Sequence, residues 1–339
     1  MSTLEGRERD FTFRDGERTM RFGAGVLSEA PELLRGAGFG EYALFTTSRA
    51  QELSPALVDR AARVAHVPAG PVPEAAAAVR GQAGGLPIVS LGGGRVVDAA
   101  KAVAGADGLR TAAVPTTLAG SPFTGIHRMP AGVEEWRLVR PVLVVADPEL
   151  MGSPPERQLA ATAMNALAHA SESLYGANAN PVTERVALRA AELFAAGLAP
   201  GALDREALAL GSLLGGYAVG LAGLGVHHAL CQTIVRTAGT PHAETNAVML
   251  PHSLRLMAPR APRELALLAR ALGRSGDAPG EAGDAVAQLA RCAGPTSLRE
   301  LGLDAAVLPA IRDAALEHPA FAATGATPDE VESLLAAAL

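Results

Sequence analysis

Short apolar runs alternate with helical patterns over about the first 150 residues, and this alternation most restricts what the chain can fold into. A strand, a helix and a second strand in succession predict a parallel sheet that helices cover on both faces. We predict helices over residues 26–37, 50–64, 73–80 and 96–104, and strands over residues 42–46, 87–91, 111–114 and 142–146. The segment FTFRDGERTMRFGAG, residues 11–25, has two extended pieces around Asp15-Gly16 and predicts a β-hairpin.

After Asp147-Pro148 the alternation ends. From residue 154 to the end, the chain is rich in Ala and Leu at a 3.6-residue period, which predicts helices packed on one another. A chain of 339 residues is also too long for one compact core and suits two domains of about 150 residues each. We therefore predict an α/β domain over residues 1–150 and an all-α domain over residues 151–339, with the active site in a cleft between them.

Composition argues against several classes of partner. A net charge of −6 and an isoelectric point near 5.8 give no basic surface for nucleic acid. No uncharged apolar run approaches the ~18 residues of a membrane span, and charged residues run through the first 20 positions, unlike a signal peptide. Two cysteines are too few for a disulfide framework. We expect a cytoplasmic protein that acts on a small molecule, without a nucleic-acid or membrane partner.

Histidines are concentrated in one stretch of the second half. Residues 225–252, GVHHALCQTIVRTAGTPHAETNAVMLPH, hold four of the eight: His227, His228, His242 and His252. A fifth, His169, follows Asn165 by four residues in TAMNALAHASESLYG, so both lie on one helical face. Imidazoles at this density either face a metal or substrate cleft, or are scattered helix residues with local hydrogen bonds.

A glycine-rich motif, SLGGGRVVDAAKAVA, occupies residues 90–104. A predicted strand runs into Gly92, Gly93 and Gly94 and then directly into a helix that carries Asp98 and Lys101. Glycines there permit positive φ and a close backbone approach, and the helix start offers N–H groups to an anion such as a pyrophosphate. The motif is neither GxGxxG nor a P-loop, and a tight turn without a ligand is the alternative interpretation.

Hydroxyl groups gather after another predicted strand. The stretch VPTTLAGSPFTG, residues 114–125, contains Thr116, Thr117, Ser121 and Thr124. A loop of this kind suits contacts to phosphate, ribose or a nicotinamide amide. Hydroxyl-rich loops are, however, usually only turns and caps, so this stretch predicts a site only together with the others.

These stretches resemble, in the same order, the iron-containing (group III) alcohol dehydrogenase superfamily, and they are similar to its maleylacetate reductase branch. The resemblance covers roughly residues 10–335 and rests on GGGRVVDAAK, PTTLAGSPFT, DPEL, MNALAHASESLYG with ANANP, and HH…PHAETNAVMLPH. It implies the dehydroquinate synthase-like architecture of iron-type alcohol dehydrogenases, with an α/β N-terminal dinucleotide-binding domain and an all-α C-terminal domain, in a homodimer. It implies NADH or NADPH along Gly92, Gly93, Gly94, Arg95, Asp98, Thr116, Thr117 and Thr46. No acidic residue follows Thr46 to hold a ribose 2′-hydroxyl, so either cofactor is allowed.

In metal-dependent relatives an Asp and three His hold Fe²⁺ or Zn²⁺, and the corresponding residues here are Asn165, His169, His228 and His242. Asn165 lacks the anionic oxygen of an Asp. The maleylacetate reductase branch also tends to have Asn at this place and to work without metal. If a metal binds, we expect the three histidines to be its ligands. Without one, the same imidazoles would bind substrate carboxylates or polarise a carbonyl, and His228 or His242 would donate the proton.

Four other positions depart from the pattern of the branch. Gln232 and Asn246 replace histidines, Pro122 replaces a glutamate, and Arg95 replaces a small residue after the three glycines. Gln232 can donate a hydrogen bond but cannot shuttle a proton near neutral pH. Pro122 removes a backbone donor as well as a carboxylate. Arg95 would either pair with an extra phosphate or obstruct the pyrophosphate turn.

Three further side chains have secondary predictions. Glu244, close to His242, is expected to accept a hydrogen bond that fixes an imidazole tautomer. Cys231 is expected to be a buried apolar thiol. His127 either approaches the cleft or packs within the domain.

The leading hypothesis is an NAD(P)H-dependent reductase of maleylacetate or a similar small oxo-acid, which delivers hydride to a carbonyl or a polarised alkene and so acts on CH–OH or CH=CH groups. Its catalytic site would consist of Asn165, His169, His228, Gln232 and His242. One alternative is a family member recruited to a non-redox biosynthetic reaction, such as a dehydration, isomerisation or cyclisation, in the same histidine pocket. A second alternative is a Zn²⁺- or Fe²⁺-dependent alcohol dehydrogenase.

Overall fold

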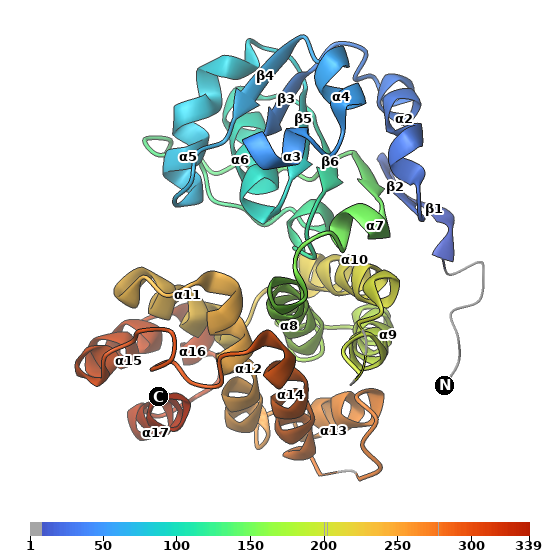
Figure 1. Cartoon of the computed structure of the whole chain (residues 1–339). Helices are drawn as coiled ribbons and strands as arrows, with labels where there is room; N and C mark the ends of the chain where they lie inside the picture. Colours follow the sequence, from blue (N-terminus) through green and yellow to red (C-terminus); the bar gives the residue numbers. More distant parts are fainter. Residues whose placement is uncertain (1–8, 200, 202, 277) are drawn as a thin grey trace. The chain divides into compact units, whose positions relative to one another are not determined.

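The computed structural model describes residues 9–199, 201, 203–276 and 278–339; residues 1–8 of the charged N-terminal segment therefore lie outside the described part of the chain. The chain divides into two compact units, one ending at Pro154 and the other beginning at Pro155. The first unit is α/β and the second is helical (Figure 1). The fold class predicted from the sequence is confirmed.

A seven-stranded sheet forms the N-terminal unit, in the order β1-β2-β7-β6-β5-β3-β4. In this order, each pair of neighbouring strands from β2 across the sheet to β4 is parallel. Strand β1 pairs antiparallel with β2 in the predicted hairpin. The sheet is thus mixed rather than purely parallel. Its strands are β1 (Phe11–Asp15), β2 (Arg18–Phe22), β3 (Ala43–Thr46), β4 (Arg63–His66), β5 (Ile88–Gly92), β6 (Thr111–Pro115) and β7 (Leu143–Ala146).

Helices cover both faces of this sheet, with α5 and α6 on one face and α2 and α4 on the other (Figure 1). Successive residues of each strand supply both cores: Leu44 packs with α2 and α4, while Ala43 and Phe45 pack with α5 and α6. Burial on both faces explains why these strands are continuous apolar runs. The helices are α2 (Ala30–Gly36), α3 (Ser48–Gln51), α4 (Pro55–Arg60), α5 (Val72–Val79), α6 (Gly94–Asp107) and α7 (Pro148–Met151), with 3₁₀ turns η1 (Val26–Glu29), η2 (Arg80–Ala83) and η3 (Ser121–Phe123).

One predicted helix is wrong. Residues 50–64 do not form a continuous helix but contribute to α3, α4 and the edge strand β4. Pro55 begins a new helix, and Ser54 before it has φ −148° and ψ 77°, outside the helical region. Arg63–His66 then pairs in parallel with β3. A four-residue strand with one buried side chain gives too little periodicity to be predicted from sequence.

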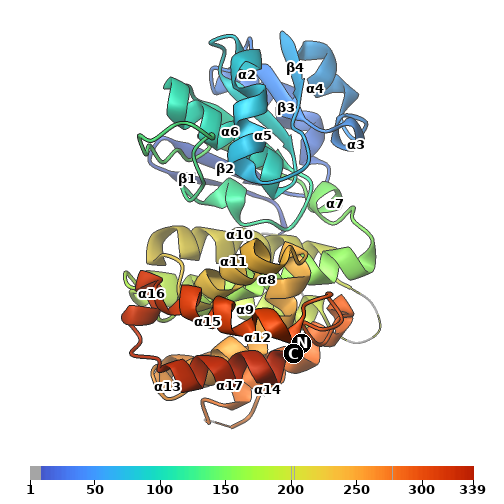
Figure 2. The same ribbon diagram turned by 90° about the vertical axis from the view of Figure 1, so that its left-hand side faces the viewer.

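The C-terminal unit consists of helices, and α12 is central because it packs against α8, α11, α14 and α17. Figure 2 shows α8, α10 and α11 on one side of this unit and α13, α14 and α17 on the other. The bounds are α8 (Glu156–Glu172), α9 (Pro181–Gly197), α10 (Arg205–Ala222), α11 (Val226–Ala238), α12 (His242–Met257), α13 (Pro262–Ala271), α14 (Glu281–Ala290), α15 (Leu308–Leu316), α16 (Pro319–Ala322) and α17 (Pro328–Ala338), with 3₁₀ turns η4 (Arg291–Ala293) and η5 (Ala305–Val307).

Helix ends in this unit follow local sequence signals. Asn180 and Thr183 form a capping box around Pro181 at the start of α9, and the Asp204 side chain caps α10. Gly239, in the left-handed conformation, ends α11. Within the described residues, no single helix has both the length and the apolar composition of a membrane span; α10 and α11 meet these criteria only as a pair, which is bent by 100°.

Candidate active site

The glycine turn joins β5 to α6 at the carboxyl edge of the sheet. Gly92 is the last residue of β5, Gly93 is the N-cap of α6, and Gly94 is its first residue. A Cβ at Gly92 would lie 2.7 Å from Val96 Cγ2, and one at Gly93 would lie 3.1 Å from Thr117 Cγ2. Gly93 has φ −78° and ψ −176°, and none of the three adopts positive φ. Of the two properties of glycine named for this motif, close approach is therefore used at Gly92 and Gly93, and positive φ is not used.

The start of α6 can receive an anion. Gly93 provides no side chain to cap the first N–H groups of this 14-residue helix, so these groups and the helix dipole are directed toward whatever binds there. Arg95, in the first turn, is exposed to solvent. A guanidinium at this place adds positive charge to the same end of the helix. The residues of the turn thus fit the pyrophosphate of a dinucleotide.

The hydroxyl loop lies directly against the glycine turn. Thr116 donates its backbone N–H to the carbonyl of Gly92 at 3.0 Å, and the Thr117 side chain faces Gly93. Thr46 is the last residue of β3, the strand that pairs with β5. Three neighbouring strands of one sheet, β3, β5 and β6, therefore end at predicted cofactor residues. The carboxyl edge, where the strand order reverses, is where dinucleotides bind in such sheets.

Two buried cations hold the hydroxyl loop in place. The wholly buried Lys101 donates to the backbone carbonyls of Ser121, Thr124 and Ile126 at 2.9, 3.3 and 2.7 Å, and its ammonium is 2.9 Å from Asp98 Oδ1. Burial lowers the pKa of Lys101, and Asp98 opposes that shift. Asp98 also accepts a hydrogen bond from the Ser121 hydroxyl. Asp98 is thus a positioning group for the loop.

Arg18, which the sequence interpretation missed, is the second cation. It is buried at the start of β2 and donates to the carbonyls of Pro141, Pro122 and Phe123 at 3.1, 3.4 and 3.3 Å. Pro122 thus contributes a carbonyl to loop packing where the branch has a carboxylate. Nothing in the sequence around Arg18 distinguishes it from the exposed charges of a hairpin.

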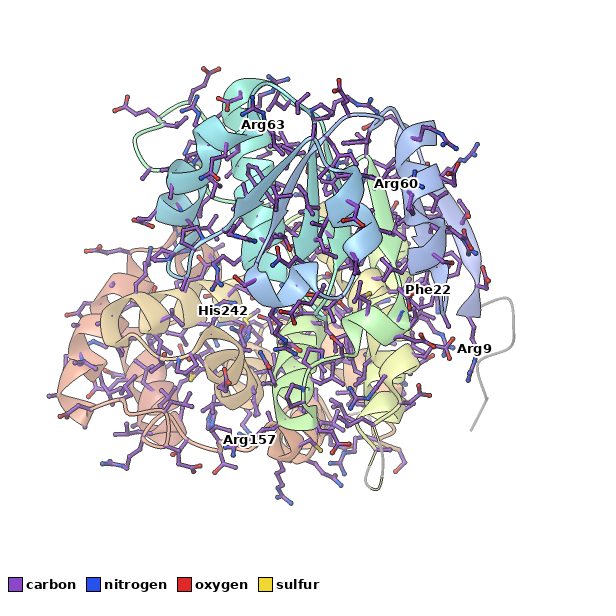
Figure 3. The ribbon with its side chains drawn as sticks, turned by 45° about the horizontal axis from the view of Figure 1, so that its top comes forward. Arg9, Phe22, Arg60, Arg63, Arg157 and His242 are labelled. Carbon is purple, nitrogen blue, oxygen red and sulfur yellow. The ribbon has the colours of Figure 1, made fainter. Side chains whose placement is uncertain are left out.

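The histidines gather in the C-terminal unit, on α8, α11 and α12. The rings of His169 on α8 and His228 on α11 stack, with 4.6 Å between centroids and 10° between planes. Asn165 lies one turn before His169 on the same face of α8. His242, labelled in Figure 3, is the exposed first residue of α12. A charge on His242 lowers the pKa of both His169 and His228, so the three belong to one electrostatic cluster.

Glu172, which ends α8, is the site residue that sequence reasoning missed. Its side chain is fully buried, and Oε2 lies 2.6 Å from His228 Nδ1. A carboxylate against an imidazole, which was predicted for Glu244 near His242, is thus found at Glu172 beside His228. The spacing held a signal, because Asn165, His169 and Glu172 at positions i, i+4 and i+7 lie on one helical face.

Burial governs the protonation of this cluster. It lowers the pKa of His228 to about 3 and that of His169 well below its usual range, because a charged imidazole loses its hydration there. Burial raises the pKa of Glu172, although backbone N–H groups and neighbouring imidazoles oppose this. Without a ligand, the buried imidazoles of His169 and His228 are therefore neutral at pH 7.

Among the described residues, four buried side-chain atoms have no hydrogen-bond partner: Asn165 Oδ1, His169 Nδ1, Tyr175 Oη and His228 Nε2. All four belong to α8, to the turn that follows it, or to α11. A buried polar atom without a partner costs about 1–3 kcal/mol. Atoms clustered in this way indicate a place where a polar ligand or water completes the hydrogen bonding.

His227, next to His228, has its hydrogen bonds satisfied inside the protein. Its Nδ1 lies 3.1 Å from Ser253 Oγ, and its Nε2 lies 2.9 Å from Asn246 Oδ1. Asn246 also donates to the carbonyl of His242 at 2.7 Å. Asn246, where the branch has histidine, therefore links His227 to the start of α12. Of the adjacent pair, His228 belongs to the site and His227 to its support.

The residues present do not fit an iron or zinc site. A metal takes the in-plane lone pairs of its imidazole ligands at a common point, whereas the stacked rings of His169 and His228 direct theirs along nearly parallel planes. Asn165 supplies a neutral oxygen, without the negative charge of the carboxylate that metal-dependent relatives have at this place. Within the described part of the chain, no three His, Cys, Asp or Glu side chains are arranged to hold a metal ion.

The remaining predicted residues have varied outcomes. Gln232 is partly buried on α11, one turn after His228. His127 is buried and bound to the backbone of Arg128 and Val139 at 2.9 and 3.0 Å, so it packs within the N-terminal unit. Cys231 is buried, as predicted, and burial raises its pKa.

Comparison with known proteins gives the family. The profile described as the C-terminal part of the Fe-containing alcohol dehydrogenase family matches residues 159–339, and the profile described as iron-containing alcohol dehydrogenase matches residues 21–155. Maleylacetate reductase 1 of Rhodococcus opacus is 33% identical over 334 residues, which cover 92% of each chain. Maleylacetate reductase of Sphingobium indicum is 35% identical over 270 residues, 74% of this chain and 76% of the relative.

A solved structure agrees with these relatives. The crystal structure of maleylacetate reductase from Agrobacterium tumefaciens superposes with a TM-score of 0.83 at 29% identity, over 97% of this chain and 98% of that one. The resemblance inferred from the five ordered motifs is confirmed. The chain belongs to the iron-containing alcohol dehydrogenase family and is an oxidoreductase.

Proposed function

We propose that the protein is an NAD(P)H-dependent reductase of maleylacetate or a similar small oxo-acid. The observation that carries this proposal is the cluster of buried, unpartnered polar atoms on Asn165, His169 and His228, whose arrangement suits a polar organic ligand better than a metal ion. Maleylacetate reductases at 33% and 35% identity support the substrate class. A homodimer in the cytoplasm is part of the same proposal and is checked by light scattering and cell fractionation.

The dinucleotide would be held by the N-terminal unit. The backbone of Gly93 and Gly94 and the start of α6 would bind the pyrophosphate, and Thr116 and Thr117 would contact the neighbouring parts of the cofactor. When bound, the reduced nicotinamide supplies a hydride. Arg95 adds a cation beside the phosphates, and Thr46 leaves both NADH and NADPH acceptable.

The histidines would handle the substrate. Neutral, buried imidazoles accept or donate hydrogen bonds, and a dicarboxylate brought next to them stabilises their protonated forms. His169 and His228 would then bind a carboxylate or polarise the carbonyl. His228 or His242 would donate the proton that completes the reduction. Gln232 would donate a hydrogen bond, since an amide does not exchange protons near neutral pH.

Calorimetric titration with NADH and with NADPH tests the proposal first. Micromolar binding of either dinucleotide is expected, followed by its oxidation when maleylacetate is added. Loss of turnover in His228→Gln, beside unchanged turnover in His66→Gln at an exposed histidine, would assign the reaction to the cluster. If neither dinucleotide binds at millimolar concentration, the reductase proposal fails, and a non-redox reaction in the same histidine pocket takes its place.

A further inference from the structure

Glu172 makes contacts of two kinds with one helix. Its Oε1 accepts hydrogen bonds from the backbone N–H groups of His227 and His228 at 2.8 and 3.3 Å. Its Oε2 faces the His228 ring, 2.6 Å from Nδ1. The side chain is fully buried, so water does not compete for either oxygen. One carboxylate therefore binds both the backbone and an imidazole of the first turn of α11.

The backbone contacts explain why residue 172, next to the start of α11, is a carboxylate. Gly225, the N-cap of α11, has no side chain that could accept the first N–H groups of the helix. Glu172 on α8 supplies that cap from another helix, at the end where the helix dipole favours negative charge. The fit is close, because a Cβ at Gly225 would lie 2.9 Å from Glu172 Oε1. Capping fixes the carboxylate before it contacts the ring.

The ring contact decides which nitrogen of His228 carries the proton. The two backbone N–H groups on Oε1 favour the ionised form of Glu172 and oppose the effect of its burial. An ionised carboxylate only accepts hydrogen bonds, so beside it the neutral ring donates from Nδ1. The lone pair is then on Nε2, the atom that has no hydrogen-bond partner among the described residues. His227 differs, because Ser253 and Asn246 engage both of its ring nitrogens. Glu172 thus leaves one imidazole nitrogen of this pair available to a ligand.

We propose that Glu172 is the positioning residue for proton transfer at His228, holding the ring as the Nδ1–H tautomer so that Nε2 exchanges the proton with the substrate. This inference rests on the proposed reductase function. In the reduction, the hydride forms the new C–H bond, at the carbonyl carbon or at an alkene carbon conjugated to the carbonyl, and the C=O electron pair moves onto oxygen. His228, which carries protons on both ring nitrogens when the substrate is bound, gives the Nε2 proton to that oxygen to form the O–H bond and returns to the Nδ1–H form; an enol formed from an alkene then becomes the ketone. The carboxylate balances the charge of the ring while Nε2 carries that proton.

The tautomer can be read directly in the wild-type protein without cofactor or substrate. With ¹⁵N-labelled histidine, two-bond ¹H–¹⁵N correlations distinguish the two neutral tautomers, and His228→Gln assigns the His228 signals. The expected pattern is a protonated Nδ1 and an unprotonated Nε2. A protonated Nε2 in the ligand-free protein would overturn the proposal. A failure of the reductase function is seen separately, as absence of dinucleotide binding.

Glu172→Gln then tests the link to turnover. The two backbone N–H groups require an oxygen opposite them, so the amide NH₂ must face Nδ1 and shift the ring proton to Nε2. With this tautomer kcat is expected to fall about 10²- to 10⁴-fold, while KM changes less than about threefold. Asp204→Asn is the matched control, because Asp204 caps α10 through backbone N–H groups alone.

A merely structural Glu172 predicts a different result. Glu172→Gln would then lower the melting temperature as Asp204→Asn does and leave kcat and the tautomer unchanged, which would contradict the proposal. Gly225→Ala provides a second test with Glu172 intact, because its Cβ displaces Oε1. It is expected to lower kcat in the same direction. Unaltered kcat alongside a shifted tautomer in either variant would also overturn the proposal.

Discussion

The imidazole of His169 lies almost parallel to that of His228, with 10° between the ring planes. Because parallel rings cannot direct two lone pairs at one ion, we expect the wild-type protein to purify with substoichiometric iron and zinc. Dialysis against a chelator should leave NAD(P)H-dependent turnover unchanged. Elemental analysis and an activity assay on the same sample check both expectations.

Asn165→Asp is the comparison variant for this metal prediction. It restores the anionic oxygen on the face of α8 that carries His169 and should therefore raise the affinity for Zn²⁺ above that of the wild type. Stoichiometric metal in the wild-type protein, together with activity that chelation removes and metal restores, would contradict the prediction.

Gly93→Ala should weaken dinucleotide binding more than it affects stability. The backbone at Gly93 has φ −78°, which alanine adopts without strain, but the new Cβ would lie 3.1 Å from Thr117 Cγ2. It also occupies the place where a phosphate would approach α6. We expect the Kd for NADH or NADPH to rise about tenfold, or about 1.4 kcal/mol, in calorimetric titrations. Gly81→Ala, at an exposed glycine with open space around it, should leave the Kd unchanged.

Lys101→Met should destabilise the N-terminal unit by about 3 kcal/mol. The substitution leaves the carbonyls of Ser121, Thr124 and Ile126 without their buried donor and Asp98 without its partner. Urea unfolding followed by circular dichroism measures the loss. Arg80→Met removes an exposed ion pair with Asp107 and should cost less than about 1 kcal/mol. Equal losses in the free energy of unfolding of the two variants would show that the buried contacts of Lys101 stabilise the unit no more than an exposed ion pair does.

Acid should destabilise the protein through its buried histidines. Burial lowers the pKa of His227 and that of His228 to about 3, against 6.5 for an ordinary histidine. As the pH falls from 6.5 toward 3, the unfolded chain therefore takes up protons that the folded chain excludes. The free energy of unfolding decreases in this window, by up to about 1.4 kcal/mol per pH unit for each imidazole.

His227→Gln should make this pH dependence shallower, because one excluded proton is removed. Urea unfolding between about pH 5 and 7 measures the slope. The matched variant His66→Gln, at an exposed histidine, should keep the wild-type slope. Glu172 works in the opposite sense, since burial raises its pKa and its folded form takes up a proton before its unfolded form does. Identical slopes in wild type and His227→Gln would refute the expectation.

Elements with a long, regular pattern could be predicted from the sequence. The apolar strand ending at Gly92 and the helix after it follow from local composition, because the sheet core and the helix N-terminus need those residues. Residues 63–66 could not be predicted in the same way. They form β4 because they pair with the edge of β3, and the local sequence of residues 63–66 contains no pattern that predicts this pairing.

The residues of the candidate site likewise divide into those placed by local spacing and those placed by the packing of helices. Asn165 and His169 share a face by helical spacing, which the sequence shows directly. The contact of Glu172 with His228 joins residues 56 positions apart and depends on how α8 packs against α11. Glu244, a neighbour of His242 in sequence, was therefore predicted to contact an imidazole, whereas Glu172 contacts His228 only because the two helices pack together. Similarly, the sequence allowed two reasons for the glycines, close approach and positive φ, and only the contacts of Val96 and Thr117 in the folded unit show that close approach applies at Gly92 and Gly93.

The cap that Glu172 places on α11 couples assembly of the site to folding. A partly folded chain in which α8 and α11 have separated loses the start of α11 and the orientation of His228 in the same event. Hydrogen exchange at the amides of His227 and His228 should therefore occur only through an opening that also abolishes the site. A chain in which the C-terminal helices have not yet packed would thus contain no partly formed acid–base centre. Catalysis would begin only after the native packing is reached.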